Sequence, residues 1–296
     1  MRVVHALGAT VSVVMLTALT AWPQQSKPGL NIQELVRRAA HNEIKANKPQ
    51  AYFMYRDQVR WKTHSVTKEV IETPDGGLAS TLAMNGQPLS PEQHTQDDQK
   101  LQQFAYNAEA RRKNEEASKR DDERAATMLT SLPDAFVYTY AGNEPGPDGR
   151  ELVHLNFQPN PNFNPPNHET QVYVGMKGDL LVDLKAERIA KIDGTLFRDV
   201  NFGWGILGKL YKGGKFIIEQ REVGAGRWEM VRERLQFEGK ILLFKSLHID
   251  SDETMTDFRQ VPSNMTVAQQ LETLHKGTET VANNGGGPKG PGSNRR

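Results

Sequence analysis

The hydrophobic pattern begins with a helical period and then changes to a strand period. Between residues 31 and 46, apolar side chains recur every three or four positions, with Asn31 available as the N-cap: Ile32, Leu35, Val36, Ala39, Ala40 and Ile44. This spacing predicts an amphipathic helix. The stretches AYFMYRDQVRW, THSVTKEVIET and LASTLAMNG follow, rich in aromatic and β-branched residues and separated by turn sequences such as PDGG. They predict an antiparallel meander.

A charged helical insertion is predicted over residues 90–132. Ser90 suits the N-cap and Pro91 the first turn. From Glu109 to Arg124, 12 of 16 residues are charged, six of each sign, and no aliphatic side chain is larger than that of Ala. Opposite charges three and four residues apart favour a solvated helix, and a partner-binding surface is the alternative interpretation.

The rest of the chain predicts mainly strands. AFVYTYAG and ELVHLNFQ flank the turn-rich NEPGPDGR, and a loop with four prolines covers residues 159–167. The later predicted strands are TQVYVGM, GDLLVDL, ERIAKIDG, KFIIEQREV, RWEMVRERLQFEG, KILLFKSLHID and TMTDFRQV. Alternation at Leu180, Val182 and Leu184 indicates one apolar sheet face and one wetter face. A short helix over 266–275 and a disordered Gly/Pro-rich tail over 277–296 complete the expected order.

Residues 1–25 are typical of a signal peptide. One cation in Met1–His5 precedes the apolar run Ala6–Ala21, and the polar WPQQSKPG follows. Ala18 and Ala21 allow cleavage nearby, and an uncleaved anchor is the alternative. We therefore expect a periplasmic or secreted protein of the bacterial envelope.

Composition excludes several chemistries. The chain has no Cys, which excludes disulfides, a Cys nucleophile and a lipidated N-terminal Cys. Lys plus Arg total 37 against 36 for Asp plus Glu, so no basic bias indicates nucleic acid as a partner.

The sequence GWGILG, Gly203 to Gly208, has the G-x-G-x-x-G spacing of a dinucleotide-binding loop. Such a loop works between a strand and a helix, yet Gly213 and Gly214 break any helix here and a β-rich run follows. We therefore expect no nucleotide. The eight histidines lack metal-ligand spacing and no G-x-S-x-G occurs, so no metal, cofactor or catalytic residue is predicted. Asp250, Asp252 and Glu253 are expected in a solvated polar turn.

The hairpin GDLLVDLKAERIAKIDG, with Gly178 to Asp183 leading into Arg188 to Asp193, resembles the G-x-L-W-I-D…R-I-x-R/K pattern of the periplasmic lipoprotein-carrier superfamily. This superfamily includes the LolA and LolB lipoprotein-sorting proteins and the RseB-like envelope-stress regulators. The later WEMVRERLQFEGKILLFKSLHIDSDETMTDFRQV is similar to their closing strands. The resemblance implies one α+β, mainly antiparallel domain over residues 26–276. Its sheet would be a strongly curved half-open β-barrel with helices on the concave side.

The resemblance also implies a non-enzymatic carrier for a lipid, a lipoprotein acyl chain or another apolar ligand. A glycine-rich apolar cluster supplies the pocket candidates, with ordinary core packing as the alternative: Trp204, Leu207, Leu210, Tyr211, Phe216 and Ile218. The alternative function is an envelope interaction or regulatory module that acts through protein–protein contacts. An enzyme of unrecognised type is the third hypothesis.

Overall fold

The computed structural model describes residues 29–46, 51–73, 77–203, 206–224, 226–242 and 245–283. The predicted signal peptide lies outside these ranges. In chain order the elements are α1 (Ile32–Ala46), β1 (Tyr52–Trp61), β2 (Ser65–Ile71), β3 (Leu78–Met84), β4 (Gln87–Pro88), α2 (Pro91–Tyr106), α3 (Ala108–Ala135), β5 (Phe136–Pro145), η1 (Pro147–Gly149), β6 (Glu151–Pro159), η2 (Glu169–Gly175), β7 (Met176–Asp183), β8 (Arg188–Leu196), β9 (Val200–Phe202), β10 (Gly208–Leu210), β11 (Lys215–Gly224), β12 (Arg227–Ile241), β13 (Lys245–Val261) and α4 (Val267–Asn283).

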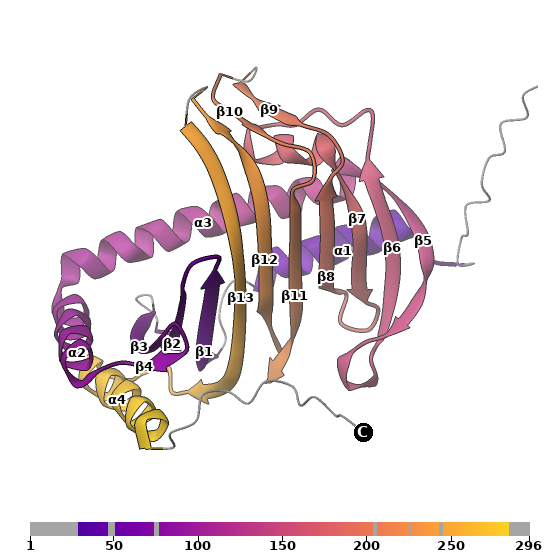
Figure 1. Cartoon of the computed structure of the whole chain (residues 1–296). Coiled ribbons are helices and arrows are strands. Elements are labelled where there is room, and N and C mark those ends of the chain that lie inside the picture. The colour runs from indigo at the N-terminus through magenta and orange to yellow at the C-terminus, as the bar shows by residue number, and fades with distance from the viewer. Residues whose placement is uncertain are drawn as a thin grey trace, which may run out of the picture.

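The strands form one antiparallel sheet in the order β4-β3-β2-β1-β13-β12-β11-β8-β7-β6-β5, and β10 joins β9 to β12. The sheet is open, with β4 and β5 at its edges, and it is neither closed nor strongly curled (Figure 1). The α+β class and the antiparallel sheet are thus confirmed. The prediction of a strongly curved half-open barrel is wrong, because the helices cover the two ends of the sheet separately instead of filling one concave face.

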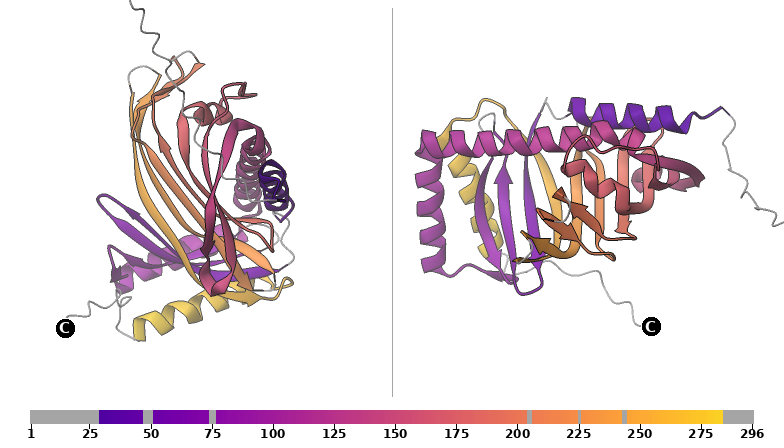
Figure 2. Two further views of the ribbon diagram at one scale, coloured as in Figure 1. Left: turned by 90° about the vertical axis from the view of Figure 1, so that its right-hand side faces the viewer. Right: turned by 90° about the horizontal axis from the view of Figure 1, so that it is seen from above.

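Two helical layers pack on opposite faces of the sheet (Figure 2). At one end, α1, the C-terminal part of α3 and η2 pack on β5 to β8 around buried residues such as Leu155 and Leu180. At the other end, α2 and α4 pack on β2 and β3 around Met54 and Ile71. We call these sides the α3 face and the α4 face. Side chains alternate between the faces of a strand, so Met54 points to the α4 face and Val59 to the α3 face.

The entry helix α1 follows the predicted pattern. Asn31 caps it by accepting a hydrogen bond from the backbone N–H of Glu34 at 3.0 Å. Leu35, Val36, Ala39 and Ala40 are buried against the core. The helical prediction for this segment is confirmed.

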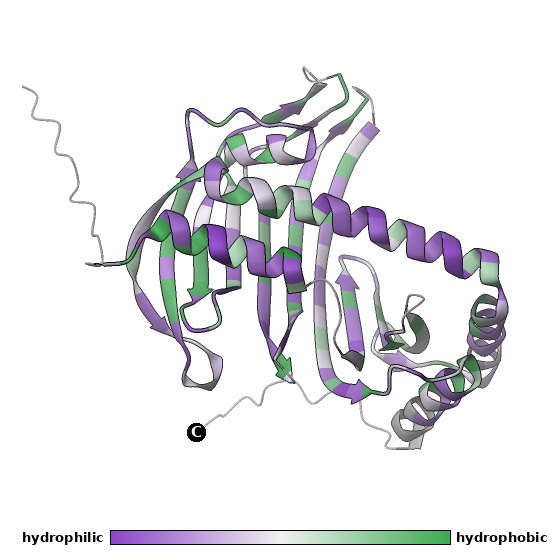
Figure 3. Cartoon of the chain, turned by 180° about the vertical axis from the view of Figure 1, so that it is seen from behind, coloured by the Kyte–Doolittle hydropathy of each residue, from purple (hydrophilic) through white to green (hydrophobic). Residues whose placement is uncertain are grey.

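The predicted helical insertion forms α2 and α3. Ser90 makes a capping box with Gln93, and Pro91 occupies the first turn. In α3, ion pairs link Lys113 to Glu109 at 2.8 Å and Arg112 to Glu116 at 2.7 Å. Figure 3 shows that the middle of α3 is hydrophilic and that this helix runs across the sheet from the α2 end to the α1 end. The predicted self-paired, exposed helix is confirmed.

Four predicted elements differ from the structure. TQVYVGM forms most of the 3-10 helix η2 and not a strand, because the Asn167 side chain accepts a hydrogen bond from the N–H of Thr170 at 3.0 Å and Tyr173 lies in the core. The predicted strand KILLFKSLHID is divided, with KI at the end of β12 and KSLHID at the start of β13. KSLHID and TMTDFRQV belong to one 17-residue strand, β13, so Asp250 and Asp252 lie within a strand and not in a turn. Helix α4 continues to Asn283 instead of ending at His275.

Candidate functional site

The central strands of the sheet, β11, β12, β13 and β1, are only half covered. Their residues are mostly of intermediate exposure on both faces. Within the described ranges no helix packs closely along the whole length of any of these four strands, although Met54 near the start of β1 lies in the core with α2 and α4. Long strands in the middle of a sheet are ordinarily covered on at least one face. The central strands are therefore the part of the fold whose exposure needs an explanation.

One row of paired residues crosses the α3 face from the covered end to the centre. It runs through Leu180, Ile192, Ile218, Glu233, Glu253 and Val59. Leu180 is fully buried and Ile192 packs against the same core. Two carboxyl groups then replace the aliphatic side chains at the positions of β12 and β13. The row is apolar where a helix covers it and mixed where none does.

A cluster of three carboxyl groups occupies the middle of this row. Glu233 and Glu253 are directly opposite each other, and Asp57 lies diagonally from Glu253 on the same face. Burial raises the pKa of Glu253 to about 7, and the nearby Asp57 and Glu233 add to the rise. A hydrogen bond between Glu253 and Asp57 contributes further, and the Lys68 ammonium opposes it. The surroundings of Glu253 therefore favour the protonated form of its carboxyl group.

The neighbours of the carboxyl cluster on the α3 face are largely apolar. Leu235 and Ile218 flank Glu233, and Met255 lies opposite Asp57. Farther along, Tyr55 stacks on Phe258 with ring centroids 5.2 Å apart. Half-exposed aliphatic groups beside a neutral carboxyl donor suit a ligand that has a hydrocarbon part and an oxygen acceptor.

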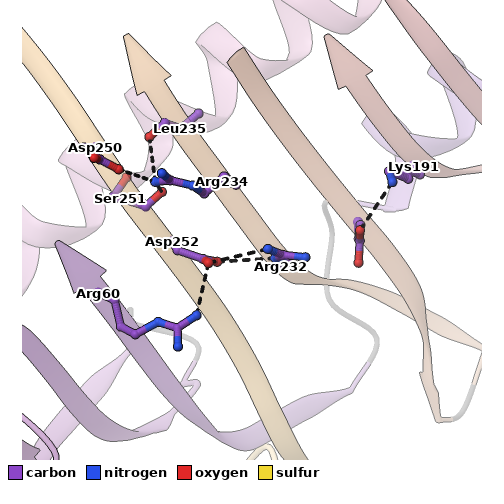
Figure 4. A network of polar contacts seen from close by, with 9 residues as sticks. Arg60, Lys191, Arg232, Arg234, Leu235, Asp250, Ser251 and Asp252 are labelled. Atoms are coloured by element: carbon purple, nitrogen blue, oxygen red, sulfur yellow. Dashed lines mark hydrogen bonds and ion pairs between the residues drawn. The ribbon is translucent and has the colours of Figure 1, made fainter. Parts of the chain in front are cut away.

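The α4 face of the same strands carries a ladder of ion pairs (Figure 4). Arg232 donates to Asp252 at 3.3 Å, and Arg60 donates to the same carboxylate at 3.1 Å. Arg234 donates to Asp250 and, at 2.9 Å, to the carbonyl of Ser251. The hydrogen bonds to Asp252 raise the pKa of Arg232. The charges on this face satisfy one another, which identifies the ladder as a structural feature.

The structure separates the residues that the sequence analysis nominated for an apolar pocket. Leu210 and Phe216 pack against the core of the covered end, and the Phe216 ring fills the space that a Cβ at Gly194 would need. Ile218 lies in the row on the α3 face. Tyr211 lies beneath the Lys209 ammonium at 5.7 Å, Leu207 is 48% exposed at a turn, and Trp204 lies outside the described residues. A shared ligand role for these six stays a prediction.

The G-x-G-x-x-G stretch connects two strands. Gly203 follows β9 with a φ of +52°, and Gly208 begins β10, which pairs antiparallel with β9. In the described stretch from Gly208 to Gly224 the chain forms β10 and β11, so no helix N-terminus lies there to bind a phosphate.

Asp57, Glu233 and Glu253 were missed as site residues. A signal was available in VRERLQF, where Glu233 occupies an inward position of an alternating strand between Val231 and Leu235. The same holds for Glu253 beside Met255. A carboxylate at an apolar-face position of a strand costs stability unless it is paired or protonated, so it marks a candidate site.

Other features of the described residues add little chemistry. Among the described residues, no group of three or more His, Asp and Glu side chains could hold a metal ion. A hollow of 540 Å³ lies between the start of α1 and β5, and one of 470 Å³ lies between α2 and α4, both away from the central strands. Across the described ranges, no helix combines the length and apolar character needed to cross a membrane.

Comparisons with known proteins leave the family open. No family model matches the sequence, and no curated protein does. Among solved structures, the chain is similar to a DUF1329 family protein from Desulfovibrio piger. That match has 12% identity and a TM-score of 0.28, and it covers 79% of this chain and 95% of the other.

Proposed function

We propose that this protein is a non-enzymatic binding or carrier protein outside the cytoplasm that holds an elongated apolar ligand, such as a lipid acyl chain, on the α3 face of the central strands. The observation that carries the proposal is the half-exposed aliphatic row beside the carboxyl cluster of Asp57, Glu233 and Glu253. The location outside the cytoplasm rests on the pattern of residues 1–25.

The energetics favour such a ligand without a conspicuous polar motif. A buried methylene contributes about 0.8 kcal/mol, so ten methylenes supply about 8 kcal/mol before the costs of association. The protonated Glu253 carboxyl would donate to an ester or carboxyl oxygen, which fixes the ligand head beside Asp57. Ile218 and Leu235 would contact the chain.

Displacement of a fluorescent fatty acid by palmitate, measured on the purified protein, tests this proposal. We expect Ile218→Asn to weaken binding about tenfold, which corresponds to about 1.4 kcal/mol. Ile217→Asn is the matched control, because Ile217 is the adjacent residue of β11 and lies on the α4 face opposite Arg234. Equal losses in both variants, or no binding by the unmodified protein, would contradict the proposal.

The second candidate is an envelope interaction module that acts through α3. The exposed charged stretch from Glu109 to Arg124 favours it, since this stretch spans the sheet without packing on the central strands. Replacing the charges by Gln and Ala at constant length keeps α2 attached to its sheet end. A carrier retains fatty-acid displacement after this change, whereas an interaction module loses its partner in a pull-down from envelope extract.

A further inference from the structure

Two neighbouring turns form the end of the sheet that extends beyond the helices (Figures 1 and 2). One turn connects β9 to β10 and the other connects β12 to β13. Leu242 N–H donates to the Leu207 carbonyl at 3.3 Å, and Gly208 pairs with Ile241. We call the four aliphatic residues described at these turns the apolar tip: Ile206, Leu207, Ile241 and Leu242.

The apolar tip is exposed. Ile206 is 60%, Leu207 48%, Ile241 37% and Leu242 58% accessible to solvent. These four are half of the eight large hydrophobic residues exposed in the described part of the chain. Single exposed aliphatic residues are ordinary, but a contiguous group at a protruding end indicates a contact with another apolar phase.

The backbone at Leu242 strengthens this interpretation. Leu242 has a φ of +49°, in the left-handed region that Gly or Asn occupies at lower cost. A leucine here is strained and buries little of its side chain in the folded protein. Neither the local backbone geometry nor core packing explains why a leucine occupies position 242.

Lysines surround the apolar tip. Lys209 and Lys240 are directly opposite each other, and Lys245 pairs with Ile241. Asp199 binds Lys209 at 2.8 Å, while Lys240 and Lys245 are exposed. The Asp199 carboxylate offsets the charge of Lys209, so the exposed Lys240 and Lys245 supply the remaining positive charge of the tip. The tip therefore combines aliphatic side chains with net positive charge.

We propose that the apolar tip inserts into the interfacial layer of an anionic phospholipid bilayer, with Lys240 and Lys245 on the lipid phosphates. Charge complementarity selects this occupant, because a second copy would bring its own lysines against these. The proposal goes beyond ligand binding at the central strands and does not depend on it. Docking would place that ligand surface beside the membrane.

Flotation of the protein with vesicles tests the proposal. The vesicles contain phosphatidylcholine and phosphatidylglycerol at 3:1, or phosphatidylcholine alone. We expect at least tenfold stronger binding to the anionic vesicles, lost progressively as salt rises. Leu207→Glu with Leu242→Glu should reduce binding at least tenfold. Lys240→Gln with Lys245→Gln should reduce binding to the anionic vesicles by about fivefold per lysine and leave binding to phosphatidylcholine vesicles unchanged.

The matched control is Met84→Glu with Val137→Glu, which adds the same charge at two exposed apolar residues far from the tip. All variants share one N-terminus, and unfolding by urea checks that each is folded. Equal binding by the tip and control variants would overturn the proposal, as would absence of flotation with anionic vesicles at low salt. Self-association that the tip variant abolishes would overturn it in favour of a second copy. A protein that binds the fluorescent fatty acid but does not float with anionic vesicles would contradict only the membrane proposal.

Discussion

One row of paired residues runs from the covered end of the sheet to its centre. Helices bury the row at the covered end, and it is half-exposed at the centre. At the covered end, α1 buries Leu180 and Ile189 completely, and even the ion pair between Glu43 and Arg188 is inside. At the centre, no helix packs closely on the described strands, and carboxyl groups interrupt the aliphatic row. The difference teaches that the same alternating pattern builds a core where a helix faces it and leaves a half-exposed surface where none does.

The largest expected contrast concerns ion pairs. Glu43 accepts from Arg188 at 2.7 and 2.8 Å and from the N–H of Ile189 at 2.9 Å. Glu43→Ala leaves a buried guanidinium without its partner, which should cost about 3–5 kcal/mol. Asp252→Ala removes the partner of Arg232 and Arg60 on the open α4 face and should cost about 0.2–1 kcal/mol. Urea unfolding measures both, and losses of similar size would remove the distinction between the two regions.

Leucine truncation gives the next contrast. Leu180→Ala creates a cavity in the packed core and should lower the free energy of unfolding by about 3 kcal/mol. Leu235→Ala removes the same atoms from a half-exposed position at the centre and should cost about 1 kcal/mol. In a displacement assay we expect the reverse order, with Leu235→Ala weakening fatty-acid binding and folded Leu180→Ala leaving it unchanged.

The smallest expected contrast depends on pH. The pKa of Glu253 is about 7 in the folded protein against 4.5 as the ordinary value, so the folded state binds the proton more tightly. Stability is highest below pH 4.5 with respect to this group, falls as pH rises, and has lost this contribution above about pH 7. Allowing for solvent screening at a half-exposed site, the loss amounts to about 1–2 kcal/mol.

Glu253→Gln should therefore flatten the decline in unfolding free energy between pH 5 and pH 8, measured in urea. Glu238→Gln is the control, since Glu238 is 70% exposed on the same strand pair. A decline that persists unchanged in Glu253→Gln would show that the carboxyl cluster does not titrate as the geometry indicates.

Much of the fold could be predicted because its signals are local. The helical spacing of 31–46 and the capping residues Asn31 and Ser90 specify helix starts, since a cap acts on its own first turn. Alternation at Leu180 and Val182 specifies a strand with one inward face. The strand prediction for TQVYVGM was wrong because it gave more weight to the β-branched residues than to Asn167, whose side chain accepts from the N–H of Thr170 at the start of η2.

The sequence by itself determined most of the elements, the caps at Asn31 and Ser90, the self-paired charges of α3 and which side chains share a face of a strand, because these depend on neighbours within a few residues. Only the tertiary structure decided that the helical layers lie on opposite faces, that Asp57, Glu233 and Glu253 meet, and that Leu207 and Leu242 form one tip. The alternation of side chains along a strand predicts which face a residue occupies, but it does not predict which strand lies beside it. Strand pairing depends on contacts between residues as far apart in the sequence as Asp57 and Glu253.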